Sequence, residues 1–219
     1  MDNKRKCVIF DLDGTLLNTI EDITDAVNIA YQKNGFASYS VKEVMYFVGS
    51  GVDLLVERSL KARGLSFDYF ASIKKEYVKA YQNCQKNKTK PYPGIIDMLA
   101  ILKNKGLKIA VISNKPQIDT EKVITHYFSR DFFDLVMGAQ QGIPLKPNPE
   151  VVFKAMTFLQ VSPKETIYVG DSDIDMKTAV NAKLESIGCT WGFRTFEELS
   201  QHQASYIVTT PEEIIKIIG

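Results

Sequence analysis

Residues 7–17 offer the clearest chemistry in the chain. A short apolar run leads directly into Asp11 and Asp13, and Gly14 and Thr15 follow within two residues. This order predicts a buried strand that ends in a polar loop. Two carboxylates this close together raise the pKa of one of them unless a cation lies between them. A divalent metal ion held by oxygen ligands would supply that cation.

The spacing of these acids excludes an EF-hand calcium loop. Such a loop needs glycine at its sixth position and glutamate at its twelfth, but counting from Asp11 places Leu16 and Asp22 there. An ordinary Asx-type turn after a strand also uses aspartate and glycine. From this stretch alone, a simple turn and a metal-binding loop both stay open.

The composition is that of an ordinary globular protein. The chain has 219 residues, of which 45% are hydrophobic and 24% charged, enough for one core and an inserted second unit. A formal net charge of +1 gives no general reason to expect nucleic acid or an anionic membrane as a partner. No apolar run resembles a signal segment or a membrane span, so we expect a cytoplasmic protein.

The three cysteines, Cys7, Cys84 and Cys189, are widely spaced. Their odd number and spacing suggest neither a disulfide framework nor a zinc site. We expect all three to be buried thiols.

Residues 20–84 show apolar spacing typical of helices and no strand pattern. The expected helices run from Ile20 to about Asn34, from Val41 to Phe47, from Val52 to Ala62, and through Phe70, Ile73, Tyr77 and Tyr81. The charged, proline-bearing residues 86–94 then read as a linker.

From Ile95 onward, expected helices and strands alternate. The helices are 95–105, 119–128, 174–182, one with Asn148 as its N-cap and Pro149 in its first turn, and a last one from Pro211; the strands are 107–112, 135–137, 167–169, 186–189 and 206–208. This alternation predicts an α/β fold, a Rossmann-like doubly wound parallel sheet with an inserted all-helical domain. The expected boundaries are 1–17 and 91–219 for the sheet domain and 18–90 for the helical domain.

Polar clusters follow several of the expected strands. They are Asp11 to Thr15, Ser113-Asn114-Lys115, Lys146 before Pro147, and residues 170–175. Ligands bind at the carboxyl ends of the strands in open parallel sheets, so these segments are expected to form one site. Taken singly, each has a simpler explanation as a turn, a surface lysine or an acidic helix start.

These four segments, in this order, resemble the motifs of the haloacid dehalogenase superfamily. The likeness covers the whole chain, because the helical insertion is similar to that family's helical cap. It implies a Mg²⁺-dependent phosphatase in which Asp11 attacks phosphorus and forms an aspartyl phosphate. Asp13 would protonate the leaving alcohol and lend its backbone carbonyl to the metal, which Asp11, Asp171 and Asp175 would also hold or support.

The resemblance also assigns the phosphate-binding groups. Ser113, Thr15 and Asn114 would hold the phosphoryl group, and Lys146 would supply fixed positive charge during transfer. The dehalogenases of the superfamily lack an acid at the position of Asp13, so its presence favours phosphoryl transfer. Asp173 is left without a role.

Two further stretches resemble phosphoglycolate phosphatases, namely residues 47–58 and 190–194. Backbone donors around Gly49 and Gly51 could bind the carboxylate of 2-phosphoglycolate, although a plain link between helices explains these glycines equally well. We expect Arg58 to be a solvated helix residue. Hinges are expected near residues 17–19 and 90–93.

The expected partner is a small phosphorylated metabolite, and the chain is expected to be a monomer or homodimer. Pyrophosphate, nucleoside monophosphates and sugar phosphates, including a mutase reaction, remain alternative substrates. A regulator that binds phosphate ligands without turnover is the alternative from a different class.

Overall fold

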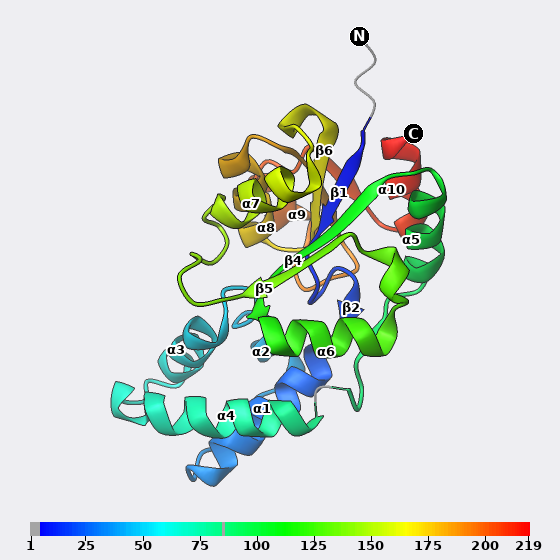
Figure 1. Cartoon of the computed structure of the whole chain (residues 1–219). Helices are drawn as coiled ribbons and strands as arrows, with labels where there is room; N and C mark the ends of the chain where they lie inside the picture. The colour runs from blue at the N-terminus through cyan, green and yellow to red at the C-terminus, as the bar shows by residue number, and fades with distance from the viewer. Residues whose placement is uncertain (1–4, 85) are drawn as a thin grey trace. The chain divides into compact units, whose positions relative to one another are not determined.

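The computed structural model describes residues 5–84 and 86–219 (Figure 1). It divides into two compact units, one with the described residues up to Leu17 together with Pro91–Gly219, and the other with Asn18–Lys90. The chain crosses between them at β2 (Leu17–Asn18) and β3 (Lys90–Pro91), which pair as a two-stranded sheet.

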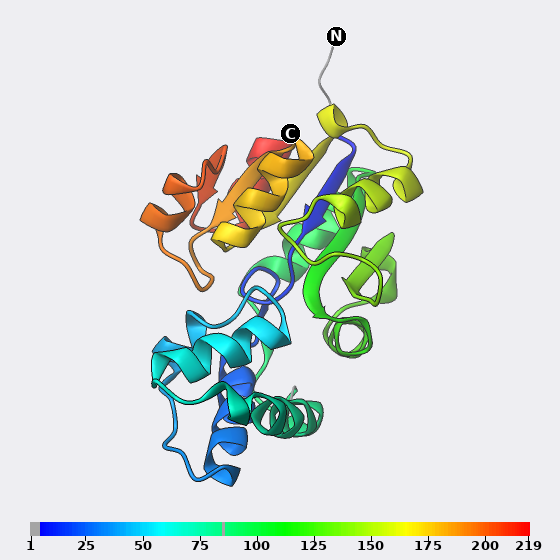
Figure 2. The same cartoon turned by 90° about the vertical axis from the view of Figure 1, so that its left-hand side faces the viewer.

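The first unit is built on a six-stranded sheet in the order β5-β4-β1-β6-β7-β8 (Figure 2). All neighbouring strands are parallel. Their bounds are β1 Cys7–Phe10, β4 Lys108–Pro116, β5 Leu135–Ala139, β6 Thr166–Gly170, β7 Glu185–Cys189 and β8 Tyr206–Val208. The predicted α/β class with a parallel sheet is confirmed.

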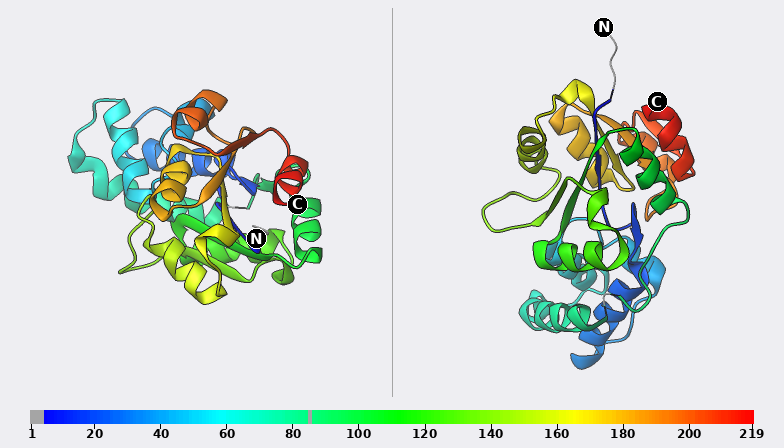
Figure 3. Two further views of the ribbon diagram at one scale, coloured as in Figure 1. Left: turned by 90° about the horizontal axis from the view of Figure 1, so that it is seen from above. Right: turned by 45° about the vertical axis from the view of Figure 1, so that its right-hand side comes forward.

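Helices cover both faces of this sheet (Figure 3). One face packs against α5 (Ile95–Asn104), α6 (Gln117–Tyr127) and α10 (Pro211–Ile218), and the other against α7 (Glu150–Leu159) and α8 (Asp173–Ala182). The short helix α9 (Phe196–Gln201) precedes β8, and the 3-10 turns η2 (Arg130–Phe132) and η3 (Pro163–Glu165) precede β5 and β6. Each sheet face therefore has its own apolar core.

Strand β1 lies at the centre of the sheet and is fully buried. Val8 and Phe10 face one core, and Cys7 and Ile9 face the other. The chain continues from β1 to β4 on one side and returns to β6 on the other, so the order of strands switches beside β1. This switch point is where open parallel sheets bind ligands.

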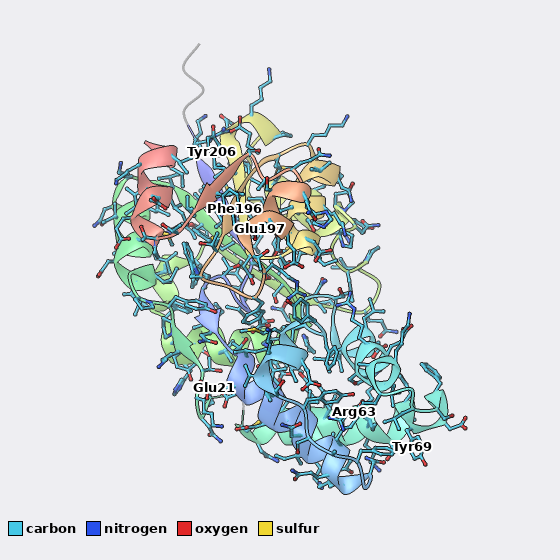
Figure 4. All side chains as sticks on the ribbon, turned by 180° about the vertical axis from the view of Figure 1, so that it is seen from behind. Glu21, Arg63, Tyr69, Phe196, Glu197 and Tyr206 are labelled. Carbon is cyan, nitrogen blue, oxygen red and sulfur yellow. The ribbon has the colours of Figure 1, made fainter. Side chains whose placement is uncertain are left out.

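The second unit contains α1 (Ile20–Lys33), α2 (Val41–Met45), α3 (Val52–Ala62), η1 (Phe67–Tyr69) and α4 (Phe70–Cys84). Tyrosines join α1 to α3, because Tyr31 donates its hydroxyl to Ser59 Oγ at 2.8 Å and Tyr39 donates to the Ser59 carbonyl at 2.5 Å. The guanidinium of Arg63, labelled in Figure 4, lies 4.0 Å from the centre of the Tyr39 ring. Aromatic and hydroxyl contacts thus fix this helical unit.

A buried carboxylate on α1 binds the last residues of the second unit. Asp22, in the first turn of α1, is fully buried. Its Oδ2 accepts hydrogen bonds from Thr89 N at 2.9 Å and Thr89 Oγ1 at 2.7 Å, and both carboxylate oxygens accept from Lys88 N. The linker is therefore attached to α1 just before the chain returns to the first unit.

Several predicted boundaries were wrong. Strand β4 runs to Pro116 instead of ending at Ile112, α2 ends at Met45, and α9 was not predicted. The N-cap of α7 is Pro149, one residue later than expected, although Asn148 Oδ1 still accepts from Glu150 N at 3.0 Å.

Cys7, Cys84 and Cys189 are buried free thiols, as predicted. Among the described residues, no helix has the length and apolar character needed to cross a membrane.

Candidate active site

The site forms where β1, β4 and β6 end in the first unit. Asp11 directly follows β1, and its backbone N–H donates to the Val169 carbonyl at 2.9 Å, which continues the pairing with β6. Asp171 directly follows β6, so both carboxylates leave neighbouring strands at the switch point. Sheet register alone therefore brings together two residues that are far apart in the sequence.

Lys146 is the cation that joins the acidic groups. Its Nζ lies 2.7 Å from Asp11 Oδ1, 2.8 Å from Asp175 Oδ1 and 3.1 Å from the Tyr168 hydroxyl. Burial by itself would lower the pKa of this lysine, but the carboxylates of Asp11 and Asp175 outweigh burial and hold its pKa well above the ordinary value. Lys146 is therefore a permanent positive charge at the site.

The side chain of Asn114 fixes the backbone of Lys146. Asn114 Oδ1 accepts from Lys146 N at 2.8 Å, and Asn114 Nδ2 donates to the Lys146 carbonyl at 3.0 Å. Both residues are buried. Strand β4 thus controls where the lysine stands, although Lys146 itself lies in a loop.

Two hydrogen bonds and two closely approaching glycines position the Asp171 carboxylate. Thr15 Oγ1 donates to its Oδ1 at 2.9 Å, and Phe193 N donates to its Oδ2 at 2.7 Å. A methyl group at Gly14 or Gly192 would come within 2.2 or 2.3 Å of Asp171 atoms. Gly14 also has a φ of +93°, a conformation that favours glycine. Only glycine at these two positions lets the backbone approach the carboxylate this closely.

Asp175 connects the start of α8 to Lys146. Its Oδ2 accepts from Ser172 N at 3.1 Å and Ser172 Oγ at 2.5 Å, and Asp175 N donates back to Ser172 Oγ, which completes a capping box. Its Oδ1 faces Lys146. Asp173 points elsewhere and forms an ion pair with Lys177 at 2.7 Å. The helix cap therefore orients one acid of this segment toward the site.

Asp13 pairs with a second lysine. Lys115 Nζ lies 2.8 Å from Asp13 Oδ1 and 2.7 Å from Asp13 Oδ2, and the two side chains are 5% and 12% exposed. Lys115 comes two residues after Ser113, whose Oγ accepts from Lys115 N at 3.2 Å. As an acceptor, this hydroxyl keeps its own proton for donation to another group.

The site is crowded with negative charge. Oxygens of Asp11, Asp171 and Asp175 all lie within 4.8 Å of one another. Burial, and then the charge of Asp175, raises the pKa of Asp11 well above its ordinary value and that of Asp171 to about 7. Such buried oxygen ligands suit a hard divalent cation such as Mg²⁺, which would relieve the repulsion between them. The donor set thus fits a metal ion of this kind.

Comparison with known proteins agrees with this arrangement. Residues 8–189 match the haloacid dehalogenase-like hydrolase family. The chain belongs to the haloacid dehalogenase-like hydrolases. The match includes every motif residue described above except those after β7.

Its relatives extend over nearly the full chain. It is 29% identical over 217 residues to a phosphoglycolate phosphatase of Aquifex aeolicus, covering 97% of this chain and 96% of the relative. A phosphoglycolate phosphatase of Cereibacter sphaeroides is 34% identical over 85% of this chain and 86% of its own. A crystal structure from Lactobacillus delbrueckii subsp. bulgaricus, of a protein proposed to be a phosphoglycolate phosphatase, superposes with a TM-score of 0.94 at 32% identity and 98% coverage of both chains.

In this haloacid dehalogenase-like hydrolase, the predicted motif residues do lie together. They are Asp11, Asp13, Thr15, Ser113, Asn114, Lys146, Asp171 and Asp175. The sequence predicts phosphate contacts for Thr15 and Asn114, but their side chains hold Asp171 and the Lys146 backbone. These contacts favour positioning roles for both residues.

Three contributors escaped the sequence analysis. They are the Lys115 ammonium on Asp13, the Tyr168 hydroxyl on Lys146, and the backbone N–H of Phe193 on Asp171. Lys115 stood beside a recognised motif, which was a usable signal. Tyr168 looks like any other residue of a buried strand, so no pattern distinguishes it before the structure is known.

Gly49 and Gly51 belong to the second unit, and their substrate contact stays a prediction. Both have positive φ, +114° and +86°, and Gly51 is the N-cap of α3. Arg58 donates to Ser50 Oγ at 2.8 Å and to the Phe47 carbonyl at 3.2 Å. The arginine thus braces this loop, which corrects our expectation of a solvated side chain.

Proposed function

We propose that this hydrolase is a Mg²⁺-dependent phosphomonoesterase that forms an aspartyl phosphate on Asp11. The observation that carries this proposal is the environment of that carboxylate. Asp11 Oδ1 is bound by Lys146, whereas no hydrogen bond to Oδ2 is found among the described parts of the chain. One oxygen is therefore fixed while the other is available for attack.

The metal would be held by the carboxylates of Asp11 and Asp171, with support from Asp175 and, by family resemblance, the backbone carbonyl of Asp13. When bound, Mg²⁺ would offset the repulsion between the Asp11 carboxylate and a dianionic phosphate ester. Thr15 and the Phe193 N–H would keep Asp171 oriented for that role. Both Asp175 oxygens already accept bonds from Lys146 and Ser172, which suits a supporting position.

The chain's own residues account for the two half-reactions. Asp11 attacks phosphorus, the bond to the ester oxygen breaks, and Asp13 gives that oxygen a proton. Asp13, now a carboxylate, takes a proton from water, which attacks the phosphorus of the aspartyl phosphate and releases phosphate and free Asp11. Lys146 and the Ser113 hydroxyl stabilise charge on the phosphoryl oxygens during both steps.

The first candidate substrate is 2-phosphoglycolate. Its support is the name shared by relatives that match along nearly the whole chain. The second unit would act as a helical cap, with Gly49 and Gly51 as candidate carboxylate contacts. Pyrophosphate, nucleoside monophosphates and sugar phosphates of similar size are the alternatives.

The test is phosphate release from a panel of these esters, with Mg²⁺ or a chelator, by the wild type and Asp11→Asn. Removal of a nucleophile is expected to reduce kcat by at least about 10,000-fold. Asp173→Asn is the matched control, since Asp173 lies in the same acidic motif but pairs with Lys177 at the surface. It should keep most of the activity.

The outcomes separate the alternatives. A preference of more than about tenfold in kcat/KM for 2-phosphoglycolate, lost without metal, supports the full proposal. An active Asp11→Asn, or turnover in the chelator, contradicts the mechanism. Binding of phosphate esters with no turnover of any of them would favour the regulator, and a preference for another ester would replace the substrate.

A further inference from the structure

We propose that Lys115 is a specificity-determining residue that binds a carboxylate on the leaving group of the substrate. The inference deepens the proposed function and rests on it. In the resting protein, Lys115 holds the Asp13 carboxylate. When a suitable substrate binds, its carboxylate takes the place of Asp13 beside the ammonium. Asp13 then takes up a proton from bulk solvent and, in its acid form, contacts the ester oxygen to which it gives that proton.

The first support is the rarity of buried cations. Among the described side chains, the buried cationic ones are Lys115, Lys146 and Arg194. Lys146 lies between Asp11 and Asp175, and Arg194 donates to the Phe193 carbonyl at 3.4 Å and stands 3.9 Å from Glu198. Of these three cations, Lys115 is the one placed on the predicted acid–base residue.

The second support is charge balance. A phosphate ester with a carboxylate brings about three negative charges into a site that already holds Asp11, Asp13, Asp171 and Asp175. Lys146 and the metal would serve the phosphoryl group. The additional carboxylate needs a cation of its own, because a buried charge without a partner is costly and the backbone donors of Gly49 and Gly51 are neutral.

The third support is reach. Both Asp13 oxygens lie within 2.8 Å of Lys115 Nζ. While Asp13 is still paired with Lys115, a leaving oxygen that one Asp13 oxygen can reach lies within two hydrogen-bond lengths of the ammonium, roughly 6 Å, and the exchange of partners starts from this arrangement. In 2-phosphoglycolate the carboxylate sits on the ester carbon itself, so its oxygens fall inside this distance. A neutral leaving group, or one whose carboxylate lies farther from the ester oxygen, could not replace the Asp13 carboxylate at Lys115 in this way.

Strand β4 gives the lysine a fixed base. Ser113 and Lys115 alternate with Asn114 along the strand, and Asn114 holds Lys146 while Lys115 holds Asp13. One short segment thus arranges the cation for the phosphoryl group and the cation proposed for the leaving group. A neutral side chain at position 115 would keep the strand but lose the second cation.

The experiment compares 2-phosphoglycolate with 2-hydroxyethyl phosphate, in which a neutral CH₂OH group replaces the carboxylate. The readout is the ratio of kcat/KM for the two esters in the wild type, Lys115→Met and Lys115→Arg. The ratio cancels any loss that arises from a displaced Asp13. We expect it to fall about 10- to 100-fold in Lys115→Met, as for loss of a hydrogen bond between charged groups, and to stay within about fivefold of the wild type in Lys115→Arg.

The matched control is Lys103→Met. Lys103 also contacts both oxygens of an aspartate, Asp134, at 2.9 Å, but at the surface and away from the site. Its ratio should equal that of the wild type. If Lys115→Met does not fold, Lys115→Gln is measured in its place, with thermal unfolding as the check.

A ratio that is unchanged in a folded, neutral Lys115 variant overturns the inference, whether both activities fall together or neither falls. Failure of the proposed function looks different. In that case the wild type itself releases no phosphate from either ester, or Asp11→Asn remains active.

Discussion

The contact between Asn114 and Lys146 leads to a prediction that separates two roles for the asparagine. In Asn114→Ala, Lys146 N and the Lys146 carbonyl both lose their partner, at 2.8 and 3.0 Å, in a buried setting. An unsatisfied buried polar group costs about 1–3 kcal/mol. With two such groups, we expect the free energy of unfolding to fall by roughly 2–6 kcal/mol, and any access of water to these groups would bring the loss toward the lower end.

Activity should fall as well, because Lys146 Nζ must reach Asp11. Displacement of a catalytic group by about 1 Å can cost about 100-fold in rate, so kcat should drop by this order with little change in KM. The assays are urea unfolding of the metal-free protein and steady-state phosphate release. Asn181→Ala is the control. Asn181 Nδ2 donates one solvent-exposed hydrogen bond, at 2.8 Å, to the carbonyl of Pro147, which is the residue after Lys146. It should cost less than about 1 kcal/mol.

The result that would refute this reasoning is a stable Asn114→Ala protein with a raised KM. Stability within about 0.5 kcal/mol of the wild type would mean that the two bonds do little to hold the Lys146 backbone. A raised KM with kcat unchanged would then mean that Asn114 contacts the phosphate directly. That is the role that the sequence predicted.

Two other predictions concern the buried acids. Burial raises the pKa of Asp171 to about 7 from 3.8, so the metal-free folded state keeps a proton that the unfolded state loses, and this group's contribution to stability falls as the pH rises between these values. Since Mg²⁺ must displace that proton, its affinity measured by calorimetry should rise by at least about tenfold per pH unit up to about pH 7, and a flat profile from pH 5.5 to 7 would contradict the assignment. In the second unit, Asp22→Asn keeps one acceptor oxygen where two now bind Lys88 N and Thr89, and should lower the free energy of unfolding by about 1–3 kcal/mol. Asp25→Asn, which breaks only the surface pair with Lys88 Nζ, should cost less than about 1 kcal/mol, and equal losses in the two variants would argue against the buried contact.

The elements were predictable where burial follows a regular period. Helix α3 was expected over Val52–Ala62 and is found there, and β1 was expected from its unbroken apolar run. Strand β4 was cut short at Ile112 because its continuation is polar. Ser113, Asn114 and Lys115 are nevertheless buried and extended. Lys146 and Asp13, distant in the sequence, are the partners of Asn114 and Lys115, and Ser113 Oγ accepts from Lys115 N. Hydrophobicity cannot reveal burial of that kind.

Short elements failed for a related reason. Helix α9 has only six residues and buries only Leu199, so it shows no apolar stripe. Its capping box, Thr195 with Glu198, was visible in the sequence and is present in the structure. For α9, the capping box was thus a better indicator of a helix than the spacing of apolar residues on which the prediction relied.

Within the site, the sequence located the motifs but not their partners. Four segments were expected at one sheet edge because parallel strands end together, and that argument needs no side-chain detail. The pair of Asp13 and Lys115 joins residues 102 positions apart, and it depends on how two loops meet. The same holds for Trp191, whose Nε1 donates to the Thr15 carbonyl at 3.0 Å. Contacts of this kind depend on the tertiary structure, so they cannot be predicted from the sequence pattern alone.

The arrangement of charge at this site favours a bound cation. Lys146 is the buried ammonium shared by Asp11 and Asp175, whereas Asp171 is held by the neutral donors Thr15 Oγ1 and Phe193 N. Burial and the charge of Asp175 raise the pKa of Asp11 well above its ordinary value and the pKa of Asp171 to about 7, so one lysine leaves excess negative charge in the cluster. In the metal-free state the cluster opposes folding at neutral pH, and the apolar cores on the two sheet faces must offset that cost. A bound divalent ion removes the repulsion, so part of its binding energy is returned as stability. The same excess of negative charge that destabilises the metal-free protein would therefore favour binding of a divalent cation.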